Sequence, residues 1–324
     1  MKKLLLALAV ILAIVFATIL YINFALPNVG PPPDIQVEIT QDKVLRGKYL
    51  SHHVMLCGEC HSKRDFSLFS GPPLPGTEFA GGEVFDHSMG FPGIFVSPNI
   101  TPAGIGHWTD GELFRLITTG VKPDGNPIFP VMPYHSYGEM DSEDIKAVIA
   151  YLRTLEPVET AHPESLADFP FSLIMRTIPK PAALSERPDR LDAVAYGAYI
   201  FNAAACGECH TQFEDGKFVG PVGAGGREFE FPDGSVLRSA NITPHSSGIA
   251  HMSREDFIQR FKAYAAPDHV YHKVNQGEFQ TIMPWSQFAG MEVEDLGAIW
   301  DYLQSLDPVD NYVQRFSPPQ IASQ

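Results

Sequence analysis

The sequence predicts a mainly helical protein, with one membrane-spanning helix at the N-terminus and two tandem units of a single fold after it. Three observations support this prediction: an apolar N-terminal run, an internal duplication, and the same order of helix signals in both copies. A length of 324 residues fits about two domains of ordinary size. We expect the following segments: 1–27 (membrane helix), 28–41 (Pro-rich spacer), 42–158 (unit one), 159–187 (linker), 188–310 (unit two) and 311–324 (tail).

The N-terminal segment is strongly apolar. Lys2 and Lys3 precede a run from Leu4 to Leu26 that contains no charged residue. A helix of about 20 apolar residues spans a bilayer, whereas a cleaved signal has a shorter run and a small-residue cleavage site. We therefore expect a retained signal anchor, with a cleaved signal as the alternative. The two lysines favour a cytoplasmic N-terminus, which leaves the rest of the chain on the other side of the membrane.

After the spacer, the chain repeats itself. Residues 132–158 align without gaps with residues 283–309, and the sequence NITP occurs at 99–102 and again at 241–244. Such a duplication indicates that both units adopt one fold. The linker between the units contains several prolines, which favour an irregular chain.

Each unit carries the same helix signals. Thr109 and Glu112 form a capping box for a helix through about Thr118, and residues 253–256 open its counterpart. A further helix before the first motif is expected near residues 42–56. The last helix of each unit has an apolar stripe and stops at a proline, Pro157 or Pro308. The stripe residues are Ile145, Val148, Ile149, Leu152 and Leu155 in unit one, and Leu296, Ile299, Trp300, Leu303 and Leu306 in unit two.

The sequence CGECH occurs twice, at residues 57–61 and 206–210. It is a C-x-x-C-H motif, the attachment signature of a c-type haem. Two thiols about one helical turn apart can form thioethers with the two vinyl groups of one porphyrin. The histidine that follows, His61 or His210, can then bind the iron. We therefore predict two covalently bound haem c groups, one in each unit.

All four cysteines of the chain, Cys57, Cys60, Cys206 and Cys209, lie in these motifs. A C-x-x-C pair can also be a redox dithiol or half of a zinc site. Zinc would need further ligands, and the nearby His52 and His53 do not recur in unit two. Zinc is therefore a remote alternative.

An electron-carrying haem needs a second axial ligand, and methionine is the usual choice where a higher potential is wanted. Met132 and Met283 each precede a proline in an irregular loop before the last helix, and we predict that they are these ligands. Met140 and Met291 also recur, but they fall in phase with the last helix and can simply pack. A third recurring pair, His107 and His251, is a weaker alternative.

The motifs and their order resemble those of the membrane-associated cytochrome c subunits of bacterial alcohol and gluconate dehydrogenases. The resemblance rests on CGECH, on SPNITPAGIGHWTDGEL at residues 97–113 and on VMPY at residues 131–134, and it is weaker in unit two. It implies two class I cytochrome c domains whose terminal helices cross at a glycine and an aromatic residue. Here these pairs would be Gly47 with Tyr151, and Gly197 with Tyr302. Those subunits usually carry three haem domains, whereas this chain has two.

In that family, such subunits pass electrons from a dehydrogenase to the respiratory chain. The resemblance therefore implies an electron-transfer protein with no catalytic residues, on the periplasmic side of the bacterial cytoplasmic membrane. Its donor would be a dehydrogenase or respiratory complex, and its acceptor a cytochrome or oxidase. The net charge of −15 argues against nucleic acid as a partner. The alternatives are a structural haem subunit and a dihaem enzyme such as a peroxidase, which two alike methionine-bearing units disfavour.

Overall fold

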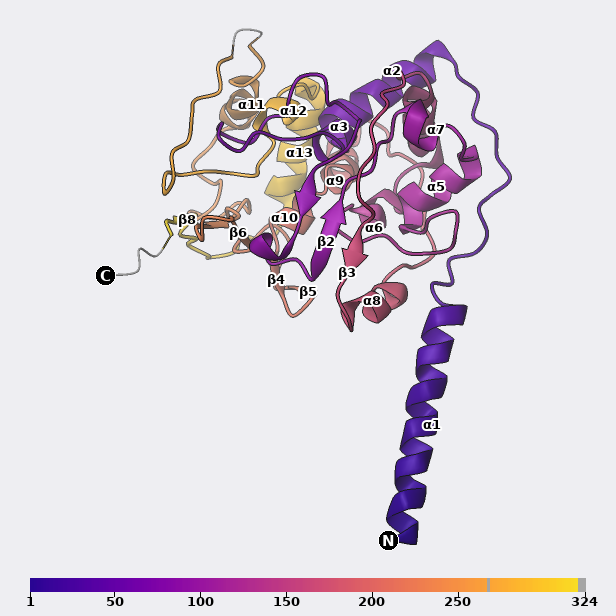
Figure 1. The fold of residues 1–324 in the computed structure, drawn as a ribbon. Helices are drawn as coiled ribbons and strands as arrows, with labels where there is room; N and C mark the ends of the chain where they lie inside the picture. The colour runs from indigo at the N-terminus through magenta and orange to yellow at the C-terminus, as the bar shows by residue number, and fades with distance from the viewer. Residues whose placement is uncertain (267–268, 320–324) are drawn as a thin grey trace.

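The computed structural model describes residues 1–266 and 269–319, and it is mainly helical (Figure 1). Five helices recur in the same order in both units, with the longest one last, and unit one also contains a π-helical turn and the short helix α4 (Pro102–Ile105). The helices of unit one are α2 (Gln41–Tyr49), the π-helical turn η1 (Leu50–Val54), α3 (Cys57–Cys60), α4 (Pro102–Ile105), α5 (Asp110–Thr119), α6 (Tyr134–Tyr137) and α7 (Ser142–Arg153). Those of unit two are α9 (Ala193–Ala203), α10 (Cys206–Cys209), α11 (Arg254–Lys262), α12 (Trp285–Phe288) and α13 (Val293–Ser305).

The helix signals of the sequence are confirmed. Thr109 and Glu112 form the capping box of α5, and Ser253 forms the same box with Asp256 at the start of α11. The last helices, α7 and α13, end at Arg153 and Ser305, a short distance before the prolines that were expected to stop them.

The first and last helices of each unit cross at a glycine, as the resemblance implied. A Cβ atom on Gly47 would lie 1.9 Å from the carbonyl oxygen of Ala147, and one on Gly197 would lie 1.9 Å from that of Ala298. Only a residue without a side chain lets the two backbones approach this closely. Tyr151 and Tyr302 lie beside the two glycines.

Unit one has one residue more than unit two between the crossing glycine and the first motif cysteine. The π-helical turn η1 absorbs this residue, and the amide of Met55 bonds to the carbonyl of Leu50 at 2.7 Å. The insertion places a histidine pair, His52 and His53, where unit two has Phe201 and Asn202.

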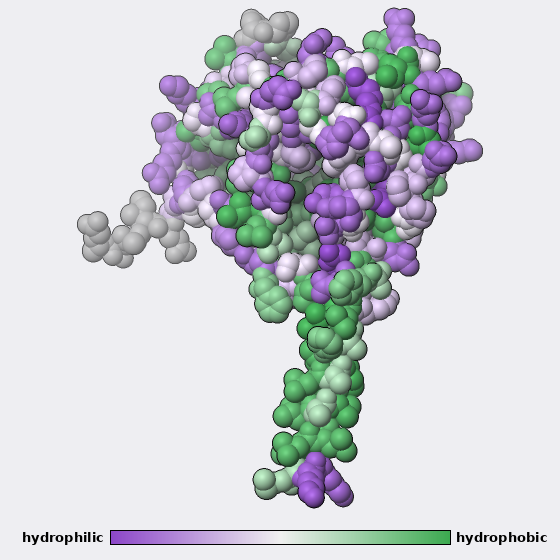
Figure 2. Space-filling view, turned by 45° about the vertical axis from the view of Figure 1, so that its right-hand side comes forward, coloured by the Kyte–Doolittle hydropathy of each residue, from purple (hydrophilic) through white to green (hydrophobic). Residues whose placement is uncertain are grey.

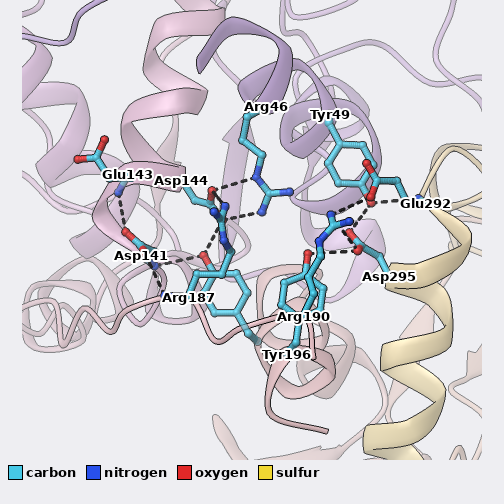
Figure 3. A network of polar contacts seen from close by, with 11 residues as sticks. Arg46, Tyr49, Asp141, Glu143, Asp144, Arg187, Arg190, Tyr196, Glu292 and Asp295 are labelled. Carbon is cyan, nitrogen blue, oxygen red and sulfur yellow. Dashed lines mark hydrogen bonds and ion pairs between the residues drawn. The ribbon is translucent and has the colours of Figure 1, made fainter. Parts of the chain in front are cut away.

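The two units meet through a reciprocal polar network (Figure 3). Tyr49 in α2 donates from its hydroxyl to Asp295 in α13 at 2.7 Å, and Tyr199 in α9 donates to Asp144 in α7 at 2.7 Å. The two aspartates are 0% and 1% exposed. Three arginines pair with these carboxylates: Arg46, Arg187 and Arg190. Because each unit supplies the same donor and the same acceptor, the units are related by an approximate two-fold axis.

The linker and the described part of the tail each contribute one short strand. The linker strand β3 (Leu166–Ala167) pairs antiparallel with β2 (Gly93–Val96), which also pairs with β1 (Val84–Phe85). In the tail, β8 (Phe316–Ser317) pairs in the same way with β7 (Val236–Arg238), beside β6 (Glu228–Glu230). Each unit thus gains a strand from the segment that follows it. A hairpin of β4 (Gln212–Glu214) and β5 (Lys217–Val219) completes the strands of unit two.

Helix α1 (Lys2–Ala25) projects from the body as an apolar rod with a hydrophilic end (Figure 2). It is long and apolar enough to cross a membrane, and no residue of it is buried. Its C-terminal end contacts α8 (Phe171–Ile174) and the 3-10 turn η3 (Met175–Thr177). Arg176 donates to the carbonyl oxygen of Leu26 at 2.9 Å, which ties the end of α1 to the body.

The Pro-rich spacer lies against unit one. The amide of Val37 donates to the carboxylate of Asp110 at 2.8 Å, and Val37 is 8% exposed. A Cβ atom on Gly111 would lie 1.9 Å from the carbonyl oxygen of Pro33. The spacer is extended, as its prolines predict, but it is docked along its length.

Candidate haem sites

Each C-x-x-C-H motif forms one short turn of helix, α3 or α10. The residue before the first cysteine has a left-handed backbone, with φ 55° at Leu56 and 51° at Ala205. This conformation is costly for residues other than glycine, and such strain is concentrated at functional sites. The same costly turn in both units presents the two thiols and the imidazole in the same way.

The two motif histidines make the same backbone contact. Nδ1 of His61 lies 2.8 Å from the carbonyl oxygen of Pro98, and Nδ1 of His210 lies 2.8 Å from that of Ala240. A carbonyl only accepts, so Nδ1 carries the proton and Nε2 keeps a free lone pair. Burial lowers the pKa of both histidines, which disfavours a second proton on either ring. Each imidazole is thus prepared to bind a metal through Nε2.

The loops that carry these carbonyls are fixed by the repeated asparagines. Asn99 donates to the carbonyl oxygen of Val158 at 2.7 Å and accepts from the amide of Thr101 at 2.9 Å. Asn241 makes the equivalent bonds to Val309 and Thr243 in unit two. These contacts give the repeated NITP sequence a structural role, because they tie each loop to the chain that follows the last helix.

Met132 and Met283 lie in irregular loops and are partly buried against the apolar core. A short helix, α6 or α12, separates each of them from the last helix, which was expected to follow directly. Met140 and Met291 are 0% and 1% exposed and lie just before α7 and α13 instead of within them. They are enclosed on all sides by the core, whereas the loop methionines keep an open side.

The remaining repeated histidines, His107 and His251, are both exposed. His251 borders a cavity of about 730 Å³ beside α11, together with Phe69, Met252 and Arg260. No motif cysteine or histidine lines this cavity. Trp108 and Met252, which occupy equivalent positions, pack against the apolar core of the protein.

The donor set fits haem c better than it fits zinc or a redox dithiol. Burial raises the pKa of Cys57 to about 11 and that of Cys206 to about 12, the opposite of the lowered pKa of a reactive dithiol. Within residues 1–266 and 269–319, no group of three or more His, Cys, Asp or Glu side chains is placed to hold a metal ion. The four cysteines form no disulfide.

Several contacts of the motifs were not predicted from the sequence. Glu59, in the first motif, is 4% exposed and pairs with Arg64 at 2.8 Å. Glu208, its counterpart, accepts from Ser136 of unit one at 2.8 Å. The glutamate that recurs in both motifs could have indicated a structural role. Its partners could not be predicted from the sequence, because neither Arg64 nor Ser136 recurs in the other unit.

Comparison with known proteins relates the second unit to a known family and much of the chain to cytochrome c subunits. Residues 194–307 match the cytochrome c family model. The gluconate 2-dehydrogenase cytochrome c subunit of Pantoea cypripedii is 32% identical over 82% of this chain and 60% of its own length. The cytochrome c subunit of the quinone alcohol dehydrogenase of Gluconacetobacter polyoxogenes is 28% identical over 78% of this chain and 54% of its own.

A shorter relative is a dihaem c-type cytochrome of Cereibacter sphaeroides, 32% identical over 48% of this chain and 53% of its own length. The chain spans about half of the length of the relatives that it matches. These relatives are cytochrome c proteins and cytochrome c subunits of dehydrogenases, in agreement with the resemblance seen in the sequence. The chain therefore contains a cytochrome c domain at residues 194–307, and about four fifths of it is similar to the cytochrome c subunits of alcohol and gluconate dehydrogenases.

Proposed function

We propose that this protein is a membrane-anchored dihaem cytochrome c made of two tandem class I domains. In this role it carries electrons from a periplasmic dehydrogenase or respiratory complex to a cytochrome or oxidase acceptor. One observation carries the proposal: both units offer two thiols, an imidazole with a free Nε2 and a loop methionine, in the same order and on equivalent elements. The names of the relatives support a dehydrogenase as the donor.

The chain's residues have separate tasks in this function. When bound, haem c supplies an iron that cycles between its ferric and ferrous states. The cysteines hold the porphyrin by thioether bonds: Cys57 and Cys60 in unit one, Cys206 and Cys209 in unit two. His61 and His210 provide the first axial nitrogen, oriented by their Nδ1 bonds to backbone carbonyls. Met132 and Met283 provide a neutral thioether, which favours ferrous iron and so raises the potential.

The anchor supports placement at a membrane. A single apolar helix, α1, precedes the body, and its lysines lie at the end that is distant from it. By the positive-inside tendency, this end stays in the cytoplasm and both units face the periplasm. Haem domains outside the cytoplasmic membrane are in reach of periplasmic dehydrogenases.

Mass spectrometry tests the cofactor content. The protein should carry two haem additions that survive acid denaturation, because thioethers are covalent. Replacing both cysteines of one motif by alanine should remove one addition and leave the other. A single addition in the unaltered protein, or zinc, would refute the dihaem assignment.

Substitution of the axial methionines tests the ligands. Met132→His and Met283→His should each lower the potential of one haem and remove half of the weak near-red band of sulfur-ligated ferric haem. Met140→Leu is the matched control and should leave the band intact. If Met140→Leu removes half of the band instead, the ligand is the core methionine. If no methionine affects the band, His107 and His251 become the candidates.

A further inference from the structure

The loop that carries Met283 is held by residues of the other unit. Gln280, three positions before Met283, is 6% exposed. Its Nε2 donates to the carbonyl oxygens of Phe66 and Leu68, both at 2.9 Å. Its Oε1 accepts from the amides of Ser70 and Thr281 at 2.9 and 2.8 Å. The four hydrogen-bonding positions of this amide are thus filled, three of them from unit one.

A serine makes the direct contact to the methionine. The hydroxyl of Ser70 donates to the carbonyl oxygen of Met283, and Ser70 is 2% exposed. Ser70 also has a left-handed backbone with φ 69°, a conformation that a serine adopts only where its surroundings impose it. Two neighbouring backbone bonds, from Phe69 to His272 and from Val274 to Ser67, join the same two segments.

The segment that reaches across begins at the first haem motif. Arg64 lies three residues after His61 and pairs with Glu59 inside the motif. The same guanidinium donates to the carbonyl oxygens of Ser70 and Gly71 at 2.8 and 2.7 Å. Residues 64–71 therefore form a braced loop between the motif of unit one and the methionine loop of unit two.

Unit one holds its own methionine loop differently. The position equivalent to Gln280 is Phe129, which stacks on Phe95 of the same unit with ring centroids 4.1 Å apart. One methionine loop is thus fixed by aromatic packing within its unit, and the other by a buried amide and a hydroxyl across the unit boundary. The duplication predicts equal loops, so this difference is particular to the second site.

We propose that Ser70 and Gln280 are positioning residues through which unit one holds Met283 in place as the axial ligand of unit two. This inference rests on the proposed function, in which Met283 binds iron. Loss of the cross-unit contacts frees the loop, so Met283 dissociates more often and external ligands compete more easily for the second haem. The first haem is unaffected, because Phe129 does not depend on these bonds.

Imidazole binding to the ferric dihaem protein tests the proposal. In Ser70→Ala and in Gln280→Glu, half of the haem should bind imidazole at least fivefold more tightly than in the unaltered protein. The same half should lose near-red absorbance, and its reduction potential should fall. Ser67→Ala in the same loop is the matched control, because the Ser67 hydroxyl bonds only to Asp65 among the described residues. Ser67→Ala should leave the imidazole affinity and the reduction potential of both haems unchanged.

Adding Met283→His to Ser70→Ala assigns the effect. The tight imidazole binding by the second haem should then disappear, and the first haem should bind imidazole as it does in the unaltered protein. Haem content by mass spectrometry verifies assembly. If Gln280→Glu fails to assemble, Ser70→Ala decides, because it removes one hydroxyl without burying a charge. Unchanged imidazole affinity and potential in Ser70→Ala would overturn the inference. An unchanged near-red band in Met283→His would instead overturn the assignment of the ligand.

Discussion

The hydroxyl of Tyr49 lies 2.7 Å from the carboxylate of Asp295, although the two residues are 246 positions apart in the chain. The same hydroxyl accepts from the amide of Glu292 at 3.1 Å. In the mirrored pair, Tyr199 contacts Asp144 and the amide of Asp141. The two units are therefore joined by side chains of their first and last helices, and each unit completes the helix cap of the other.

Removing either hydroxyl should destabilise the protein, but not equally. Without Tyr199, Asp144 keeps a two-pronged bond with Arg46, at 2.9 and 2.7 Å. Without Tyr49, Asp295 keeps only Tyr196 and a longer pair with Arg190 among the described residues. We expect Tyr49→Phe to lower the free energy of unfolding by about 2–3 kcal/mol and Tyr199→Phe by about 1–2 kcal/mol.

Denaturant unfolding of the anchor-deleted protein measures both changes. Tyr312→Phe serves as the control, since Tyr312 is 86% exposed and its hydroxyl should contribute little. Equal losses for Tyr49→Phe and Tyr199→Phe would show that Arg46 does not compensate for the missing hydroxyl.

The crossing glycines should tolerate no side chain. In Gly47→Ala or Gly197→Ala, the new methyl group would lie 1.9 Å from a backbone carbonyl oxygen, so two packed helices would have to separate. We expect a loss of more than about 3 kcal/mol in unfolding free energy, or no folded protein. Lys48→Ala is the control, because Lys48 is exposed on the same helix as Gly47. It should change the free energy of unfolding by no more than about 0.5 kcal/mol. A folded, fully stable Gly47→Ala variant would contradict the close crossing.

His52 should make stability depend on pH. Burial, with help from the charges of His53 and Lys48, lowers the pKa of His52 from 6.5 to about 4. Between these two values the unfolded chain binds a proton that the folded protein does not. The free energy of unfolding should therefore fall as the pH drops from about 6.5 to about 4, by about 1–2 kcal/mol because solvent screens the partly exposed ring.

His52→Phe copies unit two, where Phe201 occupies the equivalent place beside Tyr302 at 5.0 Å between ring centroids. Denaturant unfolding at a series of pH values should show a shallower slope in this variant than in the unaltered protein. The same slope in both proteins would mean that His52 is protonated in the fold, contrary to its buried setting.

Deleting the anchor should release the protein from the membrane. Replacement of residues 1–27 by a cleavable signal removes α1, the one helix among the described residues that is long and apolar enough to cross a bilayer. The product should be soluble, red and loaded with two haems, as judged by centrifugation and absorbance. Retention in the membrane fraction would reveal a second attachment, through the body or through a partner.

The parts of the fold that follow from local sequence were predictable. Capping at Thr109 and Ser253 depends on residues three positions apart, and the motif turns depend on residues 57–61 and 206–210. The contacts between units were not predictable in this way. Ser70 and Met283 are 213 positions apart, and nothing in either neighbourhood specifies the other. The duplication itself concealed the difference between Phe129 and Gln280, because aligned repeats suggest equal environments.

The docked spacer limits how the protein can exchange electrons. If α1 lies in the membrane as proposed, Arg176 at its end and the contacts of Val37 and Gly111 leave no slack chain between the bilayer and unit one. The body cannot swing between a donor and an acceptor in the manner of a domain on a flexible tether. Each partner must instead arrive at an accessible face of a body held at one height and one tilt, so the choice of partner is set by geometry as much as by affinity.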